Sequence, residues 1–176
     1  MDSGWEKIWQ TVQAEFADVT NEEEVTRILL RLLMAALLGA VLGFEREHKG
    51  KSAGVRTHML VSMGAALFVL APSMAGADEQ ALSRVIQGIV AGIGFLGAGT
   101  ILKGNGKDPS HVKGLTTAAG LWMTAAIGTA AGMGREATAL ISTVLALLVL
   151  ATMPILVDKV EGENDEKQQE EGSEKH

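Results

Sequence analysis

The stretch that most constrains the fold is the apolar run from Leu82 to Leu102, whose centre reads GIVAGIGFLGAGT. It has the length of a membrane-spanning helix, which needs about 20 apolar residues. The run contains a G-x-G-x-x-G pattern at Gly92, Gly94 and Gly97. That pattern binds dinucleotides when it joins a strand to a helix, and no strand pattern precedes it here. We therefore predict a membrane helix whose glycines let neighbouring backbones approach closely.

Four more segments share this apolar character, so the sequence predicts an all-α, polytopic membrane protein with five transmembrane helices. The predicted spans are Ile28–Phe44, Thr57–Ala75, Leu82–Leu102, Leu115–Met133 and Ala137–Val157. Glycine makes up 21 of 176 residues and lies mostly inside these segments, where membrane helices tolerate it. Cysteine is absent, which excludes disulfides and thiolate metal sites.

The two ends of the chain differ from the transmembrane domain, which we assign to residues 27–157. Residues 1–26 predict an N-terminal amphipathic segment, because two tryptophans and three other apolar residues recur at helical spacing. They are Trp5, Ile8, Trp9, Val12 and Phe16. This face would lie at the membrane interface or pack against the protein's own bundle. Residues 158–176 are acidic and predict a disordered tail.

Loop charge predicts the topology. The segments 45–56 and 103–114 carry 4 and 3 Lys or Arg residues, whereas Ala75–Ala81 carries none. Basic loops stay on the cytoplasmic side of the membrane. We therefore expect a multi-pass membrane protein with its N-terminus outside and its C-terminus in the cytoplasm.

Small residues recur every three or four positions in several spans and predict close helix packing. The glycines assigned to packing are Gly39, Gly43, Gly88, Gly92, Gly94, Gly97, Gly99, Gly120 and Gly128. They offer more close-packing surface than one bundle needs, so a homo-oligomer, with a dimer as the simplest case, is expected.

The spans contain no Asp or Glu, although hard cations prefer carboxylate oxygens. This argues against a divalent-cation transporter, but a broken third span could still expose carbonyls as an ion filter. Glu45 and His48 are one turn apart, and a single such pair indicates a solvated loop end rather than a metal site. No nucleophile–base pair or phosphate loop is present, so we expect neither an enzyme nor a bound cofactor.

Two arginines lie near the predicted outer ends of spans. Arg31 and Arg84 would either pair with Asp78 or Glu79 or form a site for an anion or a lipid headgroup. The opposite, inner face gathers basic and polar residues. They are Glu45, Arg46, Lys49, Lys51, Arg56, His58, Lys103, Asn105, Lys113, Thr116 and Thr117. Such a face serves topology alone, or it binds anionic lipids or a partner protein.

Four sequence motifs in this chain resemble those of a known protein family. They read RLLMAALLGAVLGFERE from Arg31, AGVRTHMLVSMGAALF from Ala53, SRVIQGIVAGIGFLGAGTIL from Ser83 and VKGLTTAAGLWMTAAIG from Val112. In this order and spacing they resemble the MgtC/SapB family of bacterial inner-membrane proteins. The resemblance implies a five-span domain, a role in adaptation to low Mg²⁺ and in virulence, and in one member restraint of the F-type ATP synthase.

The resemblance also implies which residues are functional, and this chain differs from the best-known family member in one respect. The matching candidates are Glu45, Arg46, Arg56, Thr57, Arg84, Gln87, Thr116, Thr117 and Trp122, and Asn105 of the second basic loop joins them. The best-known member carries a soluble C-terminal domain, in place of which this chain has its acidic tail. We expect a non-enzymatic regulator that contacts membrane lipids, itself and another membrane complex.

Overall fold

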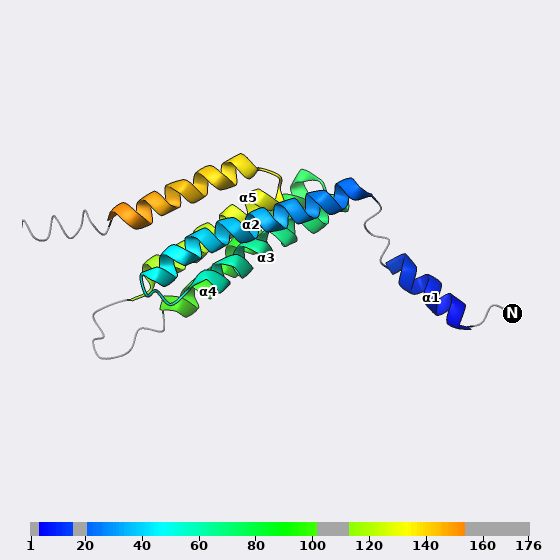
Figure 1. Cartoon of the computed structure of the whole chain (residues 1–176), viewed down its shortest axis with the longest axis horizontal. Helices are drawn as coiled ribbons and strands as arrows, with labels where there is room; N and C mark the ends of the chain where they lie inside the picture. Colours follow the sequence, from blue (N-terminus) through cyan, green and yellow to red (C-terminus); the bar gives the residue numbers. More distant parts are fainter. Residues whose placement is uncertain (1–3, 16–20, 102–112, 154–176) are drawn as a thin grey trace, which may run out of the picture.

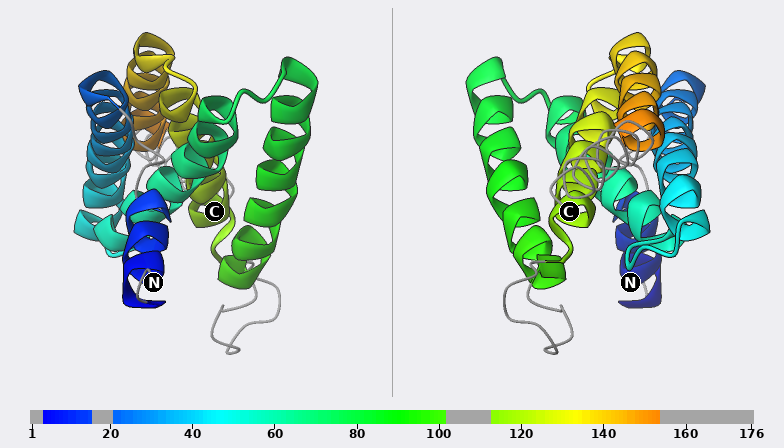
Figure 2. Two further views of the ribbon diagram at one scale, coloured as in Figure 1. Left: turned by 90° about the vertical axis from the view of Figure 1, so that its right-hand side faces the viewer. Right: turned by 90° about the vertical axis from the view of Figure 1, so that its left-hand side faces the viewer.

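The protein is all-α, as predicted. The computed structural model describes residues 4–15, 21–101 and 113–153, which contain helices and no strand. The helices are α1 (Gly4–Glu15), α2 (Glu22–His48), α3 (Val55–Met74), α4 (Glu79–Ile101) and α5 (Leu115–Gly132), followed by a helix over Glu136–Met153, here called the last helix. Figure 1 and Figure 2 together show α2 to α5 and the last helix side by side, and Figure 1 shows α1 apart from them.

The first span is longer than predicted at both ends. Asn21 caps α2, because its side-chain oxygen accepts a hydrogen bond from the Glu24 N–H at 2.8 Å. At the other end α2 continues to His48, through the first part of the predicted loop 45–56. Arg46 and His48 lie in its last turn, where basic side chains interact favourably with the negative end of the helix dipole. The loop therefore shrinks to a short link that turns at Gly50, where φ is +64°.

The other boundaries lie close to the predicted ones. The third predicted span begins earlier, at Glu79, because the Asp78 carboxylate accepts a hydrogen bond from the Ala81 N–H at 2.7 Å and caps α4. Pro72 lies near the end of α3 and is tolerated there, two residues before the helix ends at Met74. The part of the last predicted span beyond Met153, the loop 102–112 and the acidic tail lie outside the described residues.

Helix α3 lies at the centre of the packing, between α2 and α5. The α2–α3 contact forms where Gly39 and Gly43 face the α3 backbone, and the α3–α5 contact forms where Gly128 and Gly132 do the same. A second layer of alanine and leucine side chains from α2, α5 and the last helix completes the core, including Ala35, Leu38, Ala131 and Ala139. Small side chains at these positions let the backbones approach, as in membrane helix bundles.

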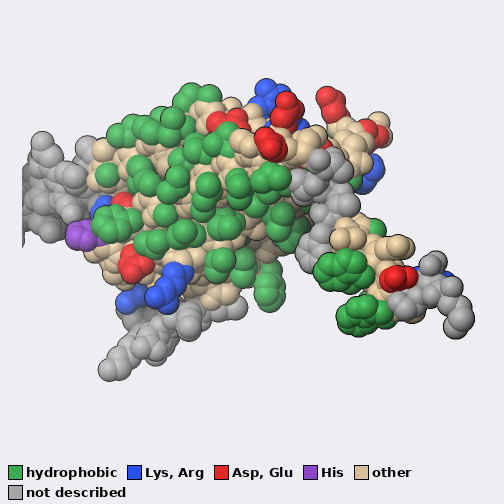
Figure 3. Space-filling view, turned by 45° about the vertical axis from the view of Figure 1, so that its right-hand side comes forward, with side chains coloured by type: hydrophobic (Ala, Val, Ile, Leu, Met, Phe, Trp, Pro, Cys, Tyr) green, Lys and Arg blue, Asp and Glu red, His purple; other side chains and the backbone are tan. Residues whose placement is uncertain are grey.

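Among the described residues, four helices are long and apolar enough to cross a membrane: α2, α3, α4 and the last helix. α5 is not among these four, although it is well buried and lies centrally between α3 and α4. Figure 3 shows a broad hydrophobic belt with charged side chains at its two ends. Phe95 is 82% exposed on this belt, as suits a side chain that faces lipid. The chain is therefore a multi-pass membrane protein, while the count of five spans stays a prediction.

The N-terminal helix α1 forms as predicted, and none of its residues is buried. Trp5 is 73% exposed and Trp9 is 57% exposed. Packing against the protein's own bundle, one of the two alternatives for this segment, does not occur among the described residues. The interfacial alternative stays a prediction.

Candidate functional site

Polar residues gather where α2 ends and α3 and α5 begin. We call this region the charged end of the bundle. It contains Glu45, Arg46 and Lys49 around the end of α2, Arg56, Thr57 and His58 in the first turn of α3, and Thr116 and Thr117 in the first turn of α5. The bundle brings the start of α5 next to the end of α2 and the start of α3, which a short link joins, although some 60 residues separate it from them in the sequence.

Glu45 forms ion pairs with two basic residues at this end. Its Oε1 lies 2.7 Å from the Lys49 Nζ, and its Oε2 lies 3.4 Å from the Arg46 Nη1. The Glu45 and Arg46 side chains are only 15% and 4% exposed. The prediction of a loop end for Glu45 and His48 is therefore wrong, because α2 continues through these residues. Glu45 is half-buried, whereas His48 is exposed to solvent as predicted. His48 stacks on Phe44, with ring centroids 6.2 Å apart.

The start of α3 is anchored to the end of α2. The Val55 N–H donates a hydrogen bond of 2.8 Å to Glu47 Oε2, which satisfies one of the free amides at the helix start. His58, one turn further along α3, is buried, and its Nδ1 lies 3.0 Å from the Gly54 carbonyl oxygen. The imidazole reaches across the bundle, since a Cβ added at Gly120 of α5 would lie 3.8 Å from its Nε2.

The other candidates at this end differ in exposure. Arg56, Thr57 and Thr116 are exposed, whereas Thr117 is buried. Asn105 lies outside the described residues. Among the residues that the structure describes, no group of three or more His, Asp or Glu side chains could hold a metal ion.

At the opposite end, Arg31 binds backbone instead of a carboxylate. Its Nη1 donates a hydrogen bond of 3.0 Å to the carbonyl oxygen of Gly132, the last residue of α5. Arg84 and Gln87 are exposed on α4. Neither arginine forms an ion pair with Asp78 or Glu79 in the described parts of the chain. The predicted pairing does not occur, because Asp78 turns to cap α4 and the α5 terminus lies nearer to Arg31.

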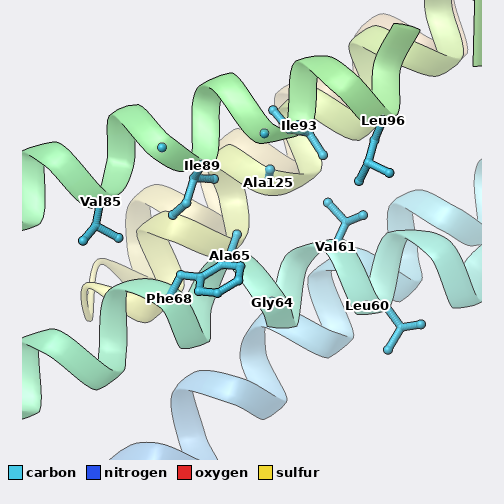
Figure 4. A pocket seen from close by; sticks show the side chains of 12 residues that line it. Leu60, Val61, Gly64, Ala65, Phe68, Val85, Ile89, Ile93, Leu96 and Ala125 are labelled. Atoms are coloured by element: carbon cyan, nitrogen blue, oxygen red, sulfur yellow. The ribbon is translucent and has the colours of Figure 1, made fainter. Parts of the chain in front are cut away.

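An apolar groove of about 570 Å³ separates α3 from α4. Figure 4 shows Val61 and Phe68 of α3 facing Val85, Ile89 and Leu96 of α4 across it. α4 is a continuous helix from Glu79 to Ile101, so its carbonyls bond within the helix. Trp122, half exposed on α5, lines a separate pocket of about 150 Å³ against α4.

The packing glycines fall into two groups. A Cβ added at Gly39 would lie 2.6 Å from the His58 carbonyl oxygen, and one at Gly43 would lie 2.6 Å from the Val55 Cα. Gly128 meets the Ser62 backbone in the same way, while Gly97 only touches Ala118 at 3.4 Å. Added side chains would meet nothing within 4 Å at Gly88, Gly92, Gly94 and Gly99. None of the described helices therefore packs against these four glycines.

The sequence reasoning missed the partners of the α5 glycines. Ser62 and Ala66 of α3 lie against Gly128 and Gly132 of α5, and Ser62 is fully buried. Both pairs are spaced by four residues, so matching intervals of small residues on two spans were the available signal.

Comparison with known proteins finds a matching family model and several similar proteins. A family model described as MgtC family matches residues 32–159. Protein SrpB of Synechococcus elongatus is 48% identical over 130 residues, which cover 69% of this chain and 71% of that protein. No solved structure matches the chain.

Two further relatives are longer. The Escherichia coli K12 protein named "Putative magnesium transporter YhiD" is 39% identical over 143 residues, covering 77% of this chain and 65% of that protein. Protein MgtC of Salmonella typhimurium is 44% identical over 119 residues, covering 68% of this chain and 49% of that protein. The chain thus spans about half the length of MgtC.

Proposed function

Because the chain belongs to the MgtC family, we propose that it is a non-enzymatic regulator of Mg²⁺ homeostasis in the bacterial inner membrane. The name of one relative, "Putative magnesium transporter YhiD", mentions magnesium, and another relative is protein MgtC. In this proposal the protein acts through contacts in the membrane, with lipids, with a second copy and with another membrane complex. The resemblance supplies the F-type ATP synthase as a candidate for that complex.

The observation that carries this proposal is that α4 is unbroken and that most of its glycines are not covered by another helix. The helix is continuous, yet four of its glycines lie open and only Ile93 and Gly97 are buried. In an unbroken helix the carbonyls before the last turn are hydrogen-bonded and cannot line an ion filter, whereas an open small-residue face suits contact with a helix of another protein. The described helices also lack a cluster of acidic and histidine side chains that could hold a cation.

The alternative is a small ion transporter or channel. The apolar groove between α3 and α4 favours it, because α4 could move relative to α3 and open a path there. The name of the YhiD relative points in the same direction.

Two measurements on the same preparation separate these functions. The chain is purified from native membranes in mild detergent for co-purification and cross-linking, and it is reconstituted into vesicles for Mg²⁺ flux. The regulator proposal expects a bound partner or a second copy and no flux above empty vesicles. A protein that purifies alone and supports specific flux would overturn it.

The Arg84→Ala variant separates the two functions further, because Arg84 is exposed on α4 and its loss should leave the fold intact. The regulator proposal expects weaker partner or oligomer cross-linking and no effect on flux. Loss of flux with unchanged cross-linking would support the transporter. Arg27→Ala, an exposed arginine on α2, is the matched control.

A further inference from the structure

Arg46 is a buried cation with too few partners. Its side chain is 4% exposed, and its Nη1 lies 3.4 Å from Glu45 Oε2. The Nε and Nη2 atoms are shielded from solvent, and neither has a hydrogen-bond partner among the residues that the structure describes. Burying a guanidinium without satisfying its donors is strongly unfavourable, so this arrangement indicates a place for an anion.

The nearby carboxylate cannot serve as that anion, because Glu45 is shared. Its other oxygen lies 2.7 Å from Lys49 Nζ, so one carboxylate faces two cations. One positive charge at this end of α2 is left without a counterion among these three residues. Lys49 also reaches the last helix, where its Nζ donates a hydrogen bond of 3.0 Å to the Leu150 carbonyl oxygen.

A cavity of about 310 Å³ lies between α2, α5 and the last helix. Its walls are mainly apolar and include Leu42, Met123 and Leu150, with His58 among the few polar groups. Figure 1 shows the end of the last helix standing away from the bundle, at the end where α2 finishes. An apolar cavity of this size in a membrane protein suits a hydrocarbon chain.

Arg46 does not itself line the cavity, and helix geometry places it one turn beyond Leu42, in the last turn of α2. Leu42 lines the cavity, and Arg46 follows it by four residues, so the two share one face of α2. Lys49, three residues after Arg46, contacts Leu150 of the cavity wall. The face of α2 that carries Leu42, Arg46 and Lys49 therefore runs from the apolar cavity to its polar rim.

We propose that this cavity binds one anionic phospholipid, whose phosphate lies on Arg46 and whose hydrocarbon lies against Leu42 and the last helix. The guanidinium fork matches two phosphate oxygens. The end of α2 lies at the edge of the hydrophobic belt, where headgroup phosphates occur. The Lys49 side chain, 37% exposed, moves from Leu150 to admit the headgroup and adds a second cation.

The test measures binding of phosphatidylglycerol to the delipidated full-length protein in detergent, by native mass spectrometry and by the thermal unfolding midpoint. Inorganic phosphate and a diacylglycerol with the same acyl chains are the two comparison probes. The wild-type protein should retain one phosphatidylglycerol and unfold at a higher temperature with it. Neither comparison probe should produce this shift. An equal shift with inorganic phosphate would overturn the proposal, since the cavity would then play no part.

Two variants locate the site. Arg46→Met removes the charge and should weaken phosphatidylglycerol binding about tenfold or more, the loss expected for one charge-assisted hydrogen bond. Ala146→Phe fills the cavity without touching the charged residues and should weaken binding as well. Arg56→Met, an exposed arginine at the same end, is the matched control and should bind normally.

The outcomes are distinct. Undiminished binding by either Arg46→Met or Ala146→Phe would overturn the proposal. Equal weakening in Arg56→Met would also overturn it, because binding would then follow the overall charge. If Arg46→Met fails to fold, Ala146→Phe still decides the matter on its own, since its side chain competes only with the hydrocarbon.

Discussion

Gly128 of α5 lies so close to Ser62 of α3 that a side-chain carbon at residue 128 would overlap the Ser62 carbonyl group. One turn later Gly132 meets Ala66 in the same way. These two contacts bring the backbones of α3 and α5 together at the centre of the bundle. In lipid, where apolar side chains gain little by leaving the solvent, such close approach is a main source of helix association.

Gly128→Ala should therefore destabilise the protein. The added methyl group must push α5 away from α3, and overpacking of this kind costs about 1–3 kcal/mol. The measurement is thermal unfolding in detergent. Gly94→Ala is the matched control, because residue 94 has nothing within 4 Å and alanine favours a helix by about 1 kcal/mol over glycine. Equal effects of the two substitutions would contradict this account of the α3–α5 contact.

Arg31→Met should loosen the connection between α2 and the end of α5. The guanidinium donates to the Gly132 carbonyl, one of the carbonyls that a helix leaves free at its end. A hydrogen bond to a charged group contributes about 1.5–3 kcal/mol, and the partial exposure of Arg31 favours the lower value. Arg27→Met removes an exposed arginine one turn earlier and should leave the unfolding midpoint unchanged. An unaltered midpoint for Arg31→Met would show that the bond is not stabilising.

Gly114→Ala should affect stability more than Gly50→Ala. Both glycines have positive φ, +97° and +64°, which costs an alanine about 1–2 kcal/mol. At Gly114 the new Cβ would also lie 2.5 Å from the Thr100 carbonyl oxygen, whereas at Gly50 it meets nothing within 4 Å. The difference between the two unfolding free energies measures the contact between the ends of α4 and α5. No difference would mean that this contact relaxes freely.

Glu47→Ala should destabilise the start of α3. The carboxylate accepts the Val55 N–H at 2.8 Å, and losing such a cap costs about 1 kcal/mol. Glu47→Gln retains an acceptor oxygen and should lose only part of this energy. Hydrogen exchange of the first amides of α3 would locate the effect. Faster exchange spread evenly over the bundle would argue against a local cap.

The predicted topology can be tested with single cysteines, because the chain has none of its own. Ser52→Cys lies in the link between α2 and α3, and Gln80→Cys lies in the first turn of α4, at opposite ends of the bundle. Both positions are exposed. An impermeant thiol reagent added to intact cells should label residue 80 and spare residue 52. The reverse pattern would invert the assignment of the N-terminus to the outside.

Much of the fold could be predicted from local patterns. Apolar runs of helical length located α2, α3, α4 and the last helix, and the spacing of Trp5 and Trp9 predicted α1. The boundaries were less predictable. The charged residues after Phe44 read as a loop, yet Glu45, Arg46 and His48 continue α2, because their pairing and the helix dipole stabilise its last turn.

The candidate site followed from the sequence only in part. Glu45 and Arg46 were identified, but the partners that Glu45, Lys49 and Arg31 have in the structure were not. Arg31 and Lys49 each bind a carbonyl oxygen about a hundred residues away, and a carbonyl group carries no sequence signal.

The sequence by itself determined that this chain is a helical membrane protein, because span length and apolar composition are local properties. Only the tertiary structure decided which glycines pack. Gly39 and Gly128 look no different in sequence from Gly88 and Gly92, yet the first two meet α3 and the other two face an open groove. The physical reason is that close packing belongs to a pair of helices, and the partner backbone is supplied by a distant part of the chain.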